Sequence, residues 1–323
     1  MIVVTGAAGF IGSCLVAELN SRGRYDLIVV DDYTGEDDPK KKNLTGKRYQ
    51  RFYDKAEYLK LLKRDQFDFD VDCILHMGAC SSTTLQDADY FEKNNYEYSC
   101  VVAQWALKNK ARLIYASSAA TYGAGENGYD DDEALIYRLK PLNLYGQSKQ
   151  KFDEWVLSNG HQERIVGLKF FNVFGPNEYH KGDMRSVVSK AYDRVVSEGK
   201  MFLFKSYDPK YKDGEQMRDF IYVKDVVDVV MFMMDKSSVN GIFNLGTGKA
   251  RTWNDLAFAL FKAVGRPPKI EYMEMPEILR GRYQYFTEAN MAKLRKSGYT
   301  KLFTPLEDTV KDYCGYLSTQ RHW

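Results

Sequence analysis

The chain opens with an apolar run followed by three glycines at fixed spacing. Residues 1–4, Met-Ile-Val-Val, are typical of a buried strand, and Gly6, Gly9 and Gly12 follow as G-x-x-G-x-x-G. In such a turn the first glycine permits the tight bend, the second lets the backbone approach a pyrophosphate, and the third lets a helix pack closely on the sheet. The helix beyond would point its free N–H groups at the phosphates. The opening therefore predicts a dinucleotide-binding strand–turn–helix unit.

The next apolar strand, residues 27–30, ends in two acids, Asp31 and Asp32. They lie about 20 residues past the glycines, where an acidic or basic group of a dinucleotide-binding unit meets the adenosine ribose. Asp31 by itself favours the free 2′-hydroxyl of NAD, whereas the 2′-phosphate of NADP needs basic partners.

Further along, the pattern alternates between strands and helices. We expect strands at 72–77, 112–118 and 166–171, with a long helix from about 87 to 108. Ligands of open parallel sheets sit beyond the carboxyl ends of strands. The residues at such ends are Gly6, Asp31, Gly78 and Ser118. The predicted fold class is α/β, a Rossmann-type doubly wound parallel sheet.

Beyond residue 170 the segments shorten and aromatic residues cluster. We expect residues 1–170 to form the cofactor-binding domain and residues 171–323 to form mainly a smaller substrate-binding lobe. Segments near 215–247, at 218–223 and 242–246, are expected to return to the first domain.

A tyrosine and a lysine four residues apart give the chain a candidate acid–base pair. Tyr145 and Lys149 would share one face of a helix, with Ser118 at the end of a predicted strand. A nearby ammonium favours the phenolate, so Lys149 is expected to lower the pKa of Tyr145. A phenolate can take the proton of a sugar hydroxyl while hydride leaves the same carbon, and a serine hydroxyl can hold the oxygen.

Composition excludes several classes of protein. A net charge of +2 over 323 residues gives no reason to expect nucleic acid or an anionic membrane as a partner, and no apolar run approaches the roughly 18–20 residues of a membrane span. The five cysteines form no Cys-x-x-Cys and the four histidines have no ligand spacing, so we expect no metal site. Scattered cysteines and a strand at the very start indicate a reducing compartment without a signal peptide, hence the cytoplasm.

Finer motifs resemble one enzyme family. The segments at 78–84, 117–123, 171–176, 180–182 and 281–284, together with the glycine turn and the Tyr-x-x-x-Lys pair, resemble extended short-chain dehydrogenases/reductases that act on nucleotide sugars. Gly-Ala-Cys-Ser-Ser and His-Lys-Gly are similar to the ADP-L-glycero-D-manno-heptose 6-epimerases in particular. The resemblance covers nearly the whole chain.

The resemblance implies inversion of C6 of an ADP-heptose during lipopolysaccharide precursor synthesis. A tightly held NADP would take hydride from C6 and return it to the opposite face. The family's two acid–base groups match Tyr145 and Lys181. Ser118 would hold the carbonyl oxygen, and Lys149 would lower the tyrosine pKa and bind the nicotinamide ribose. The family also forms homo-oligomers, with a pentamer expected.

The resemblance also carries over binding residues. Lys40 and Lys55 match lysines that bind NADP, whereas Asp32 stands where the family commonly has asparagine and would repel a 2′-phosphate; we expect NADP rather than NAD. The candidate cofactor contacts are Gly6, Gly9, Phe10, Ile11, Gly12, Asp31, Asp32, Lys40, Lys55, Met77, Gly78, Ala79, Cys80, Ser81, Asn94, Tyr145, Lys149, Val173 and Lys181.

Candidate substrate contacts lie mostly in the second half of the chain. Arg218 could pair with the substrate diphosphate through its fixed fork. Asp183 and Lys190 replace a serine and a histidine of the family. The full set is Ser118, Asn172, Asp183, Lys190, Phe204, Arg218 and Tyr283.

Three alternatives remain open. A nucleotide-sugar dehydratase would need an acid to expel water, yet Ala119 and Ala120 occupy the place of its usual Asp-Glu pair. A UDP-hexose 4-epimerase would keep the serine, tyrosine and lysine but lacks the His-Lys-Gly segment. A non-catalytic NADP-binding regulator would commonly lose the tyrosine or the lysine, and this chain keeps both.

Overall fold

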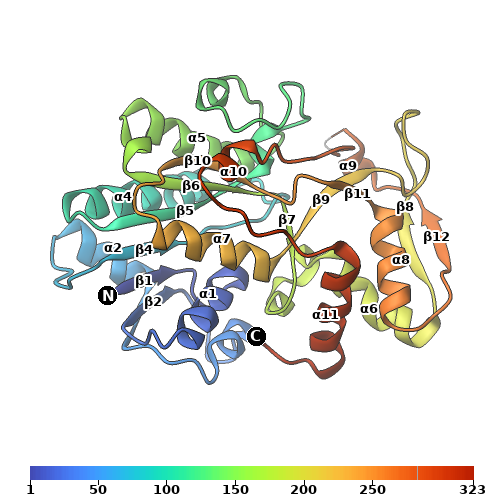
Figure 1. Cartoon of the computed structure of the whole chain (residues 1–323), viewed down its shortest axis with the longest axis horizontal. Coiled ribbons are helices and arrows are strands. Elements are labelled where there is room, and N and C mark those ends of the chain that lie inside the picture. The colour runs from blue at the N-terminus through green and yellow to red at the C-terminus, as the bar shows by residue number, and fades with distance from the viewer. Residues whose placement is uncertain (282) are drawn as a thin grey trace.

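The centre of the molecule is a seven-stranded parallel sheet in the order β10-β6-β5-β4-β1-β2-β3 (Figure 1). The computed structural model describes residues 1–281 and 283–323, so Arg282 of the 281–284 motif lies outside the described residues. The expected Rossmann-type sheet is confirmed. Its strands are β1 (Ile2–Thr5), β2 (Leu27–Asp31), β3 (Arg51–Asp54), β4 (Cys73–His76), β5 (Arg112–Ser118), β6 (Ile165–Phe170) and β10 (Gly241–Leu245).

Helices cover both faces of this sheet because its strands bury side chains on both sides. Along β1, Val4 packs into one core with α1 and α7, whereas Val3 packs into another with α2, α4 and α5. The covering helices are α1 (Phe10–Ser21) and α7 (Val223–Asp235) on one face, and α2 (Lys55–Lys63), α4 (Tyr98–Lys108) and α5 (Leu144–Ser158) on the other.

The long helix predicted from about 87 to 108 contains an irregular middle. It comprises α3 (Ala88–Phe91), a π-helical turn (Glu92–Glu97) and α4 without a break. Asp87 caps its start by accepting a hydrogen bond from the backbone N–H of Tyr90. The π-helical turn, which the sequence pattern did not reveal, carries the buried Asn95.

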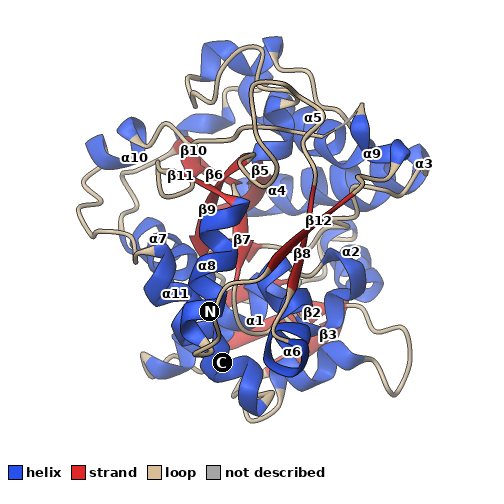
Figure 2. Cartoon of the chain, turned by 90° about the vertical axis from the view of Figure 1, so that its right-hand side faces the viewer, coloured by secondary structure: helices blue, strands red, loops and turns tan. Residues whose placement is uncertain are grey.

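The second half of the chain builds a smaller lobe with its own core. Figure 1 shows α6, α8, β8 and β12 at one end of the molecule, and Figure 2 views the chain from that end. The lobe contains β7 (Asn172–Phe174), β8 (Met201–Phe204), β9 (Met217–Tyr222), β11 (Ala250–Thr252) and β12 (Ile270–Met273). Its core contains side chains of α6 (Val187–Glu198), α8 (Trp253–Ala263) and α11 (Leu306–Thr319). The short α9 (Glu277–Arg280) also lies in this half of the chain, whereas α10 (Ala292–Lys296) packs against β10, with Leu294 in the core of the large sheet.

The two segments expected to return to the first domain lie in different sheets. Residues 241–245 form β10, the outermost strand of the large sheet, next to β6. The 218–223 segment forms most of β9, which pairs with β7 and β11 in a separate three-stranded sheet. Ile221 and Val223 of this segment nevertheless pack into a core of the large sheet. The division of the chain into two domains stays a prediction.

Short 3-10 segments connect these elements, at Pro39–Leu44, Ala119–Tyr122, Glu133–Arg138, His161–Glu163 and Tyr179–Met184. Two of them, those at 39–44 and 179–184, contain lysines predicted to act in the site. Across the described part of the chain, no helix combines the length and hydropathy that crossing a bilayer requires.

Candidate active site

A cavity of about 530 Å³ lies at the carboxyl ends of the parallel strands. It is lined by segments that follow β1, β2, β4, β5 and β6, and by the 3-10 segments with Lys40 and Lys181. Every residue predicted to contact the cofactor lines it. Among the predicted substrate contacts, Ser118 alone does so, and the others lie outside this lining set.

The glycine turn approaches its neighbours too closely for side chains. Gly6 has φ +63°, and a Cβ there would lie 2.7 Å from the Gly78 backbone. A Cβ on Gly12 would lie 2.1 Å from the carbonyl oxygen of Gly6. No side chain caps the start of α1 at Gly9, so its first N–H groups are open to the cavity. This cradle suits a phosphate group of a dinucleotide.

The Asp31 carboxylate stabilises the glycine turn through hydrogen bonds. Its carboxylate accepts hydrogen bonds from the backbone N–H of Ala8 at 2.7 Å and of Asp32 at 2.8 Å. The Lys40 ammonium lies 2.9 Å from the same side chain. Part of the hydrogen-bonding capacity that the sequence assigned to the ribose is therefore taken up inside the protein.

Two lysines converge on Asp32. Lys55 Nζ lies 2.6 Å from one carboxylate oxygen and Lys40 Nζ 3.0 Å from the other, and Lys55 also donates to Asn94 Oδ1 at 2.7 Å. Partial burial opposes ionisation, but the two lysines prevail and lower the pKa of Asp32 to about 2. Lys40 and Lys55 thus bind a carboxylate of the protein itself, that of Asp32.

Tyr145 begins the helix that faces the cavity. Asn143 caps α5 by accepting from the backbone N–H of Gly146 at 2.8 Å, which sets Tyr145 in the first turn beside Ser118. Burial raises the pKa of Tyr145, and a hydrogen bond with Ser118 opposes that rise. Lys149 donates to the carbonyl oxygen of Ala116 at 2.7 Å. The expectation that Lys149 lowers the tyrosine pKa is therefore not met here, because desolvation dominates.

The Lys149 ammonium is itself strongly buried. Burial lowers its pKa to about 8, and the carboxylate of Asp153 is the main opposing influence. A lysine with such a pKa exchanges its proton near neutral pH.

Lys181 lines the cavity from the 3-10 segment at 179–184, whose backbone kinks at Gly182. Its Nζ lies 5.3 Å from the centre of the Phe10 ring. Burial lowers the pKa of Lys181, with the carboxylate of Glu178 opposing. This direction is the one that a lysine acting as a base requires.

Asn43 ties this turn to the glycine turn. Its side-chain amide donates to the carbonyl oxygen of Ala8 at 2.8 Å and to that of Asn177 at 3.1 Å, and it lies 3.2 Å from His180 Nδ1. Burial, followed by Lys181 and Lys40, lowers the pKa of His180 to about 4, so its imidazole is neutral. The neutral ring adds no positive charge beside Lys181.

The predicted substrate contacts other than Ser118 do not line the cavity. Arg218 is buried, with its guanidinium 5.0 Å from the Tyr283 ring and 5.8 Å from that of Trp253. Its side chain donates to the carbonyl oxygen of Met217, not to the neighbouring Asp219. Lys190 donates to the carbonyl oxygen of Asp183 at 3.2 Å. Asn172 and Phe204 lie at the start of β7 and the end of β8.

Several lining residues were not predicted. They are Val30, Ser82, Tyr90, Tyr98, Ala116, Phe170, Phe171, His180 and Met184. Most are apolar or aromatic, and such residues in a sequence cannot be told from core. His180 could have been predicted, because it is polar and directly precedes Lys181 in the sequence.

A nucleotide-binding sheet with a serine, a tyrosine and two lysines around its cavity defines the chain as a dinucleotide-dependent enzyme of the short-chain dehydrogenase/reductase class. Residues 2–246 match the NAD dependent epimerase/dehydratase family. An ADP-L-glycero-D-manno-heptose-6-epimerase of Nitratidesulfovibrio vulgaris (strain DP4) is 53% identical over 313 residues, covering 97% of this chain and 96% of the relative. One of Fusobacterium nucleatum subsp. nucleatum is 46% identical over 330 residues, covering 99% of each.

A solved structure agrees with these relatives. The Helicobacter pylori ADP-L-glycero-D-manno-heptose-6-epimerase superposes with a TM-score of 0.79 at 29% identity, covering 98% of this chain and 96% of that one. The chain belongs to the NAD dependent epimerase/dehydratase family and, within it, to the ADP-L-glycero-D-manno-heptose-6-epimerases.

Proposed function

We propose that this enzyme is an isomerase that interconverts ADP-D-glycero- and ADP-L-glycero-D-manno-heptose by inverting C6, in the synthesis of lipopolysaccharide core precursors. The observation that carries the proposal is one cavity lined by the glycine turn, Ser118, Tyr145 and Lys181, in a chain 53% identical to an enzyme of that name. A nicotinamide dinucleotide bound there would supply a hydride acceptor and donor.

Two side chains transfer protons, one on each face of the reacting carbon C6. Tyr145 takes the proton of the C6 hydroxyl on one face, while Ser118 holds the oxygen in place. We assign the other face to Lys181, which lines the same cavity from a separate segment and whose pKa is lowered by burial. Lys149 donates to the nicotinamide ribose.

The residues present fit a dinucleotide, and we infer that it is NADP. Lys40 and Lys55 would hold the 2′-phosphate. The phosphate must either displace the Asp32 carboxylate from these two lysines or share them with it. Asn94, bonded to Lys55, fixes one of the two ammonium groups. The glycine turn and the start of α1 would hold the pyrophosphate.

At the substrate end, we propose that Arg218 and Tyr283 bind the ADP moiety, with Asn172, Asp183, Lys190 and Phe204 around it. The buried guanidinium between two aromatic rings supports this role for Arg218. Residues 171–323 would then be mainly the substrate-binding lobe. A homo-oligomer, expected as a pentamer, and a cytoplasmic location remain predictions.

The test is incubation of the purified enzyme with ADP-D-glycero-D-manno-heptose, without added cofactor. NMR and mass spectrometry should find the C6 epimer at unchanged mass, with no net reduction of NADP. A product lighter by one water would indicate a dehydratase, and stoichiometric NADPH a net dehydrogenase. Either result would refute the proposal.

A further inference from the structure

A fully buried ion pair lies behind the catalytic candidates, and the proposed mechanism does not use it. Lys169 Nζ is 2.6 Å from Asp153 Oδ2, and neither side chain has any exposed surface. Asp153 follows Lys149 by one turn of α5, and Lys169 pairs in register with Ser117 of β5. Buried ion pairs are often no more stabilising than apolar residues of the same volume, so stability alone does not account for this one.

The carboxylate of Asp153 holds the end of β5. Oδ1 accepts from the Tyr115 hydroxyl at 2.8 Å, and Oδ2 accepts from the Ser117 hydroxyl at 2.7 Å. Residues two apart in a strand share a face, so Ala116 and Ser118 point the other way, where both line the cavity. The carboxylate thereby fixes the strand that presents Ser118.

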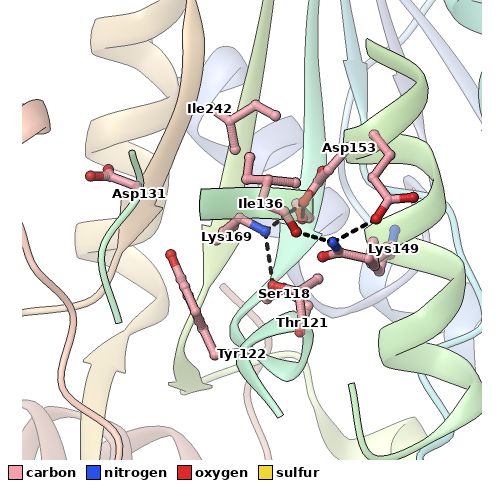
Figure 3. Close-up of polar contacts among 12 residues, drawn as sticks. Ser118, Thr121, Tyr122, Asp131, Ile136, Lys149, Asp153, Lys169 and Ile242 are labelled. Carbon is pink, nitrogen blue, oxygen red and sulfur yellow. Dashed lines mark hydrogen bonds and ion pairs between the residues drawn. The ribbon is translucent and has the colours of Figure 1, made fainter. Parts of the chain in front are cut away.

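The ammonium of Lys169 reaches Ser118 by a second path. It donates to Thr121 Oγ1 at 2.8 Å, and the Thr121 hydroxyl donates to the carbonyl oxygen of Ser118 at 2.8 Å. Figure 3 shows Lys169 between Asp153 and Thr121, with the Tyr122 ring alongside. The Tyr122 ring centre is 5.3 Å from Lys169 Nζ.

Asp153 is also the main negative charge acting on Lys149. The pKa of Lys149 is lowered to about 8 by burial, with Asp153 and then the Cys80 thiol opposing. On β4, the His76 imidazole is neutral because burial lowers its pKa to about 3, with Lys149 adding to that effect. Among these groups, the carboxylate of Asp153 has the largest effect opposing the burial of Lys149.

We propose that Asp153 and Lys169 are positioning residues: Asp153, one turn of α5 beyond Lys149, is the counter-charge of Lys149, while Lys169 holds the Asp153 side chain in place and anchors Ser118 through Thr121. Lys149 can hold the nicotinamide ribose as a charged donor only while it carries its proton. The turnover part of this inference rests on the proposed epimerase function, whereas the ionisation of Lys149 does not.

The decisive variant removes both charges together. In Asp153→Asn/Lys169→Met, the amide oxygen still accepts from a hydroxyl, and neither member of the Asp153–Lys169 pair is left buried without the other. Without the carboxylate, the pKa of Lys149 falls, so the ammonium is lost at lower pH. The alkaline limb of kcat/KM should move down by about one pH unit, the lower end of what an adjacent opposite charge causes. At pH 8, kcat should fall about fivefold while KM changes little, because a Lys149 pKa that moves from about 8 to about 7 lowers the protonated fraction from about one half to about one eleventh.

A second variant separates position from charge. Thr121→Val removes the link to Ser118 and leaves the Asp153–Lys169 ion pair in place. It should lower kcat without moving the alkaline limb. A Thr121→Val enzyme whose alkaline limb moves as far as in the double variant would contradict the division of roles.

A matched control exists at the far side of the molecule. The Asp312 carboxylate accepts from the Tyr222 hydroxyl at 2.5 Å and from Lys224 Nζ at 2.7 Å, the same donor types that meet Asp153. Lys224→Met/Asp312→Asn should leave the pH profile unchanged.

The inference is overturned if the folded double variant keeps the wild-type kcat and pH profile. If that variant does not fold, NMR of the lysine ammonium groups in the wild-type protein decides, with Lys149→Met assigning the signal. Lys149 should titrate near pH 8, and a Lys149 already neutral at pH 7 would overturn the proposal. A wild-type enzyme without epimerase activity refutes the proposed function and leaves this titration to judge the counter-charge.

Discussion

Replacing Asp32 by asparagine should strengthen NADP binding relative to NAD. In the cofactor-free protein, Lys40 and Lys55 neutralise the Asp32 carboxylate at 3.0 and 2.6 Å, and a 2′-phosphate needs the same two ammonium groups. The carboxylate therefore competes with the phosphate and repels it. Asparagine keeps the side chain's shape and removes the charge.

The size of this effect follows from Coulomb's law. A phosphate held by the same lysines would lie roughly 6 Å from the carboxylate, where two unit charges interact by about 3 kcal/mol at an effective dielectric constant of 20. The Asp32 side chain is 49% exposed. Solvent screening at such a site reduces the repulsion to about 1–1.5 kcal/mol. Because about 1.4 kcal/mol corresponds to tenfold in affinity, the ratio of Kd for NAD to Kd for NADP should rise about tenfold.

The assay is titration of cofactor-free protein with each dinucleotide by calorimetry, at low and high salt. The gain should shrink as salt rises, because a half-exposed charge is screened. Asp26→Asn is the control, since Asp26 is similarly exposed and paired with Arg24 away from the cavity. An unchanged ratio for Asp32→Asn, or one that moves toward NAD, would refute the argument.

The other predictions concern the catalytic groups and the glycine turn. Tyr145→Phe and Lys181→Met should each lower epimerisation by about 10²–10⁴-fold while NADP stays bound, measured by product NMR and by cofactor released on denaturation; near wild-type turnover in Lys181→Met would defeat the two-base mechanism. Lys149→Met should differ, because it also loses the donor to the ribose; it should purify with less cofactor, and full retention would contradict that role. Gly12→Ala places a Cβ 2.1 Å from the Gly6 carbonyl oxygen, so α1 must shift. It should cost about 1–3 kcal/mol of stability in thermal melts, and an unchanged melting temperature would argue against the close packing.

The sequence predicted what local pattern determines. Gly6 and Gly12 can be recognised in the sequence because a tight turn against a strand excludes side chains. The patterns of 27–30 and 112–118 predict buried parallel strands. The cavity residues at strand ends followed from the prediction of a parallel sheet, whose ligands lie beyond the carboxyl ends of the strands. The buried ion pair also has a trace in the sequence, because Lys169 lies within an apolar strand and Asp153 lies one turn beyond Lys149. The sequence prediction did not include this pair.

Other features depend on contacts between distant segments. The pairing of β9 with β7 and β11 depends on which strand edges come together in the folded chain. The apolar pattern of 218–223 is equally consistent with a strand of either sheet. The π-helical turn depends on Asn95, whose side chain bonds the Cys80 backbone and Ser148. The raised pKa of Tyr145 reflects burial, which residue spacing does not report.

The position of β10 has a consequence for biosynthesis. Its partner β6 ends at Phe170, and β10 begins only at Gly241. At about 5–20 residues per second, a ribosome needs roughly 4–14 s to supply the intervening residues 171–240. During that interval the outer edge of β6 has unpaired N–H and C=O groups, which can template association with another nascent chain. The second half of the molecule thus completes the first, and a chain arrested within residues 171–240 would emerge as an aggregation-prone species.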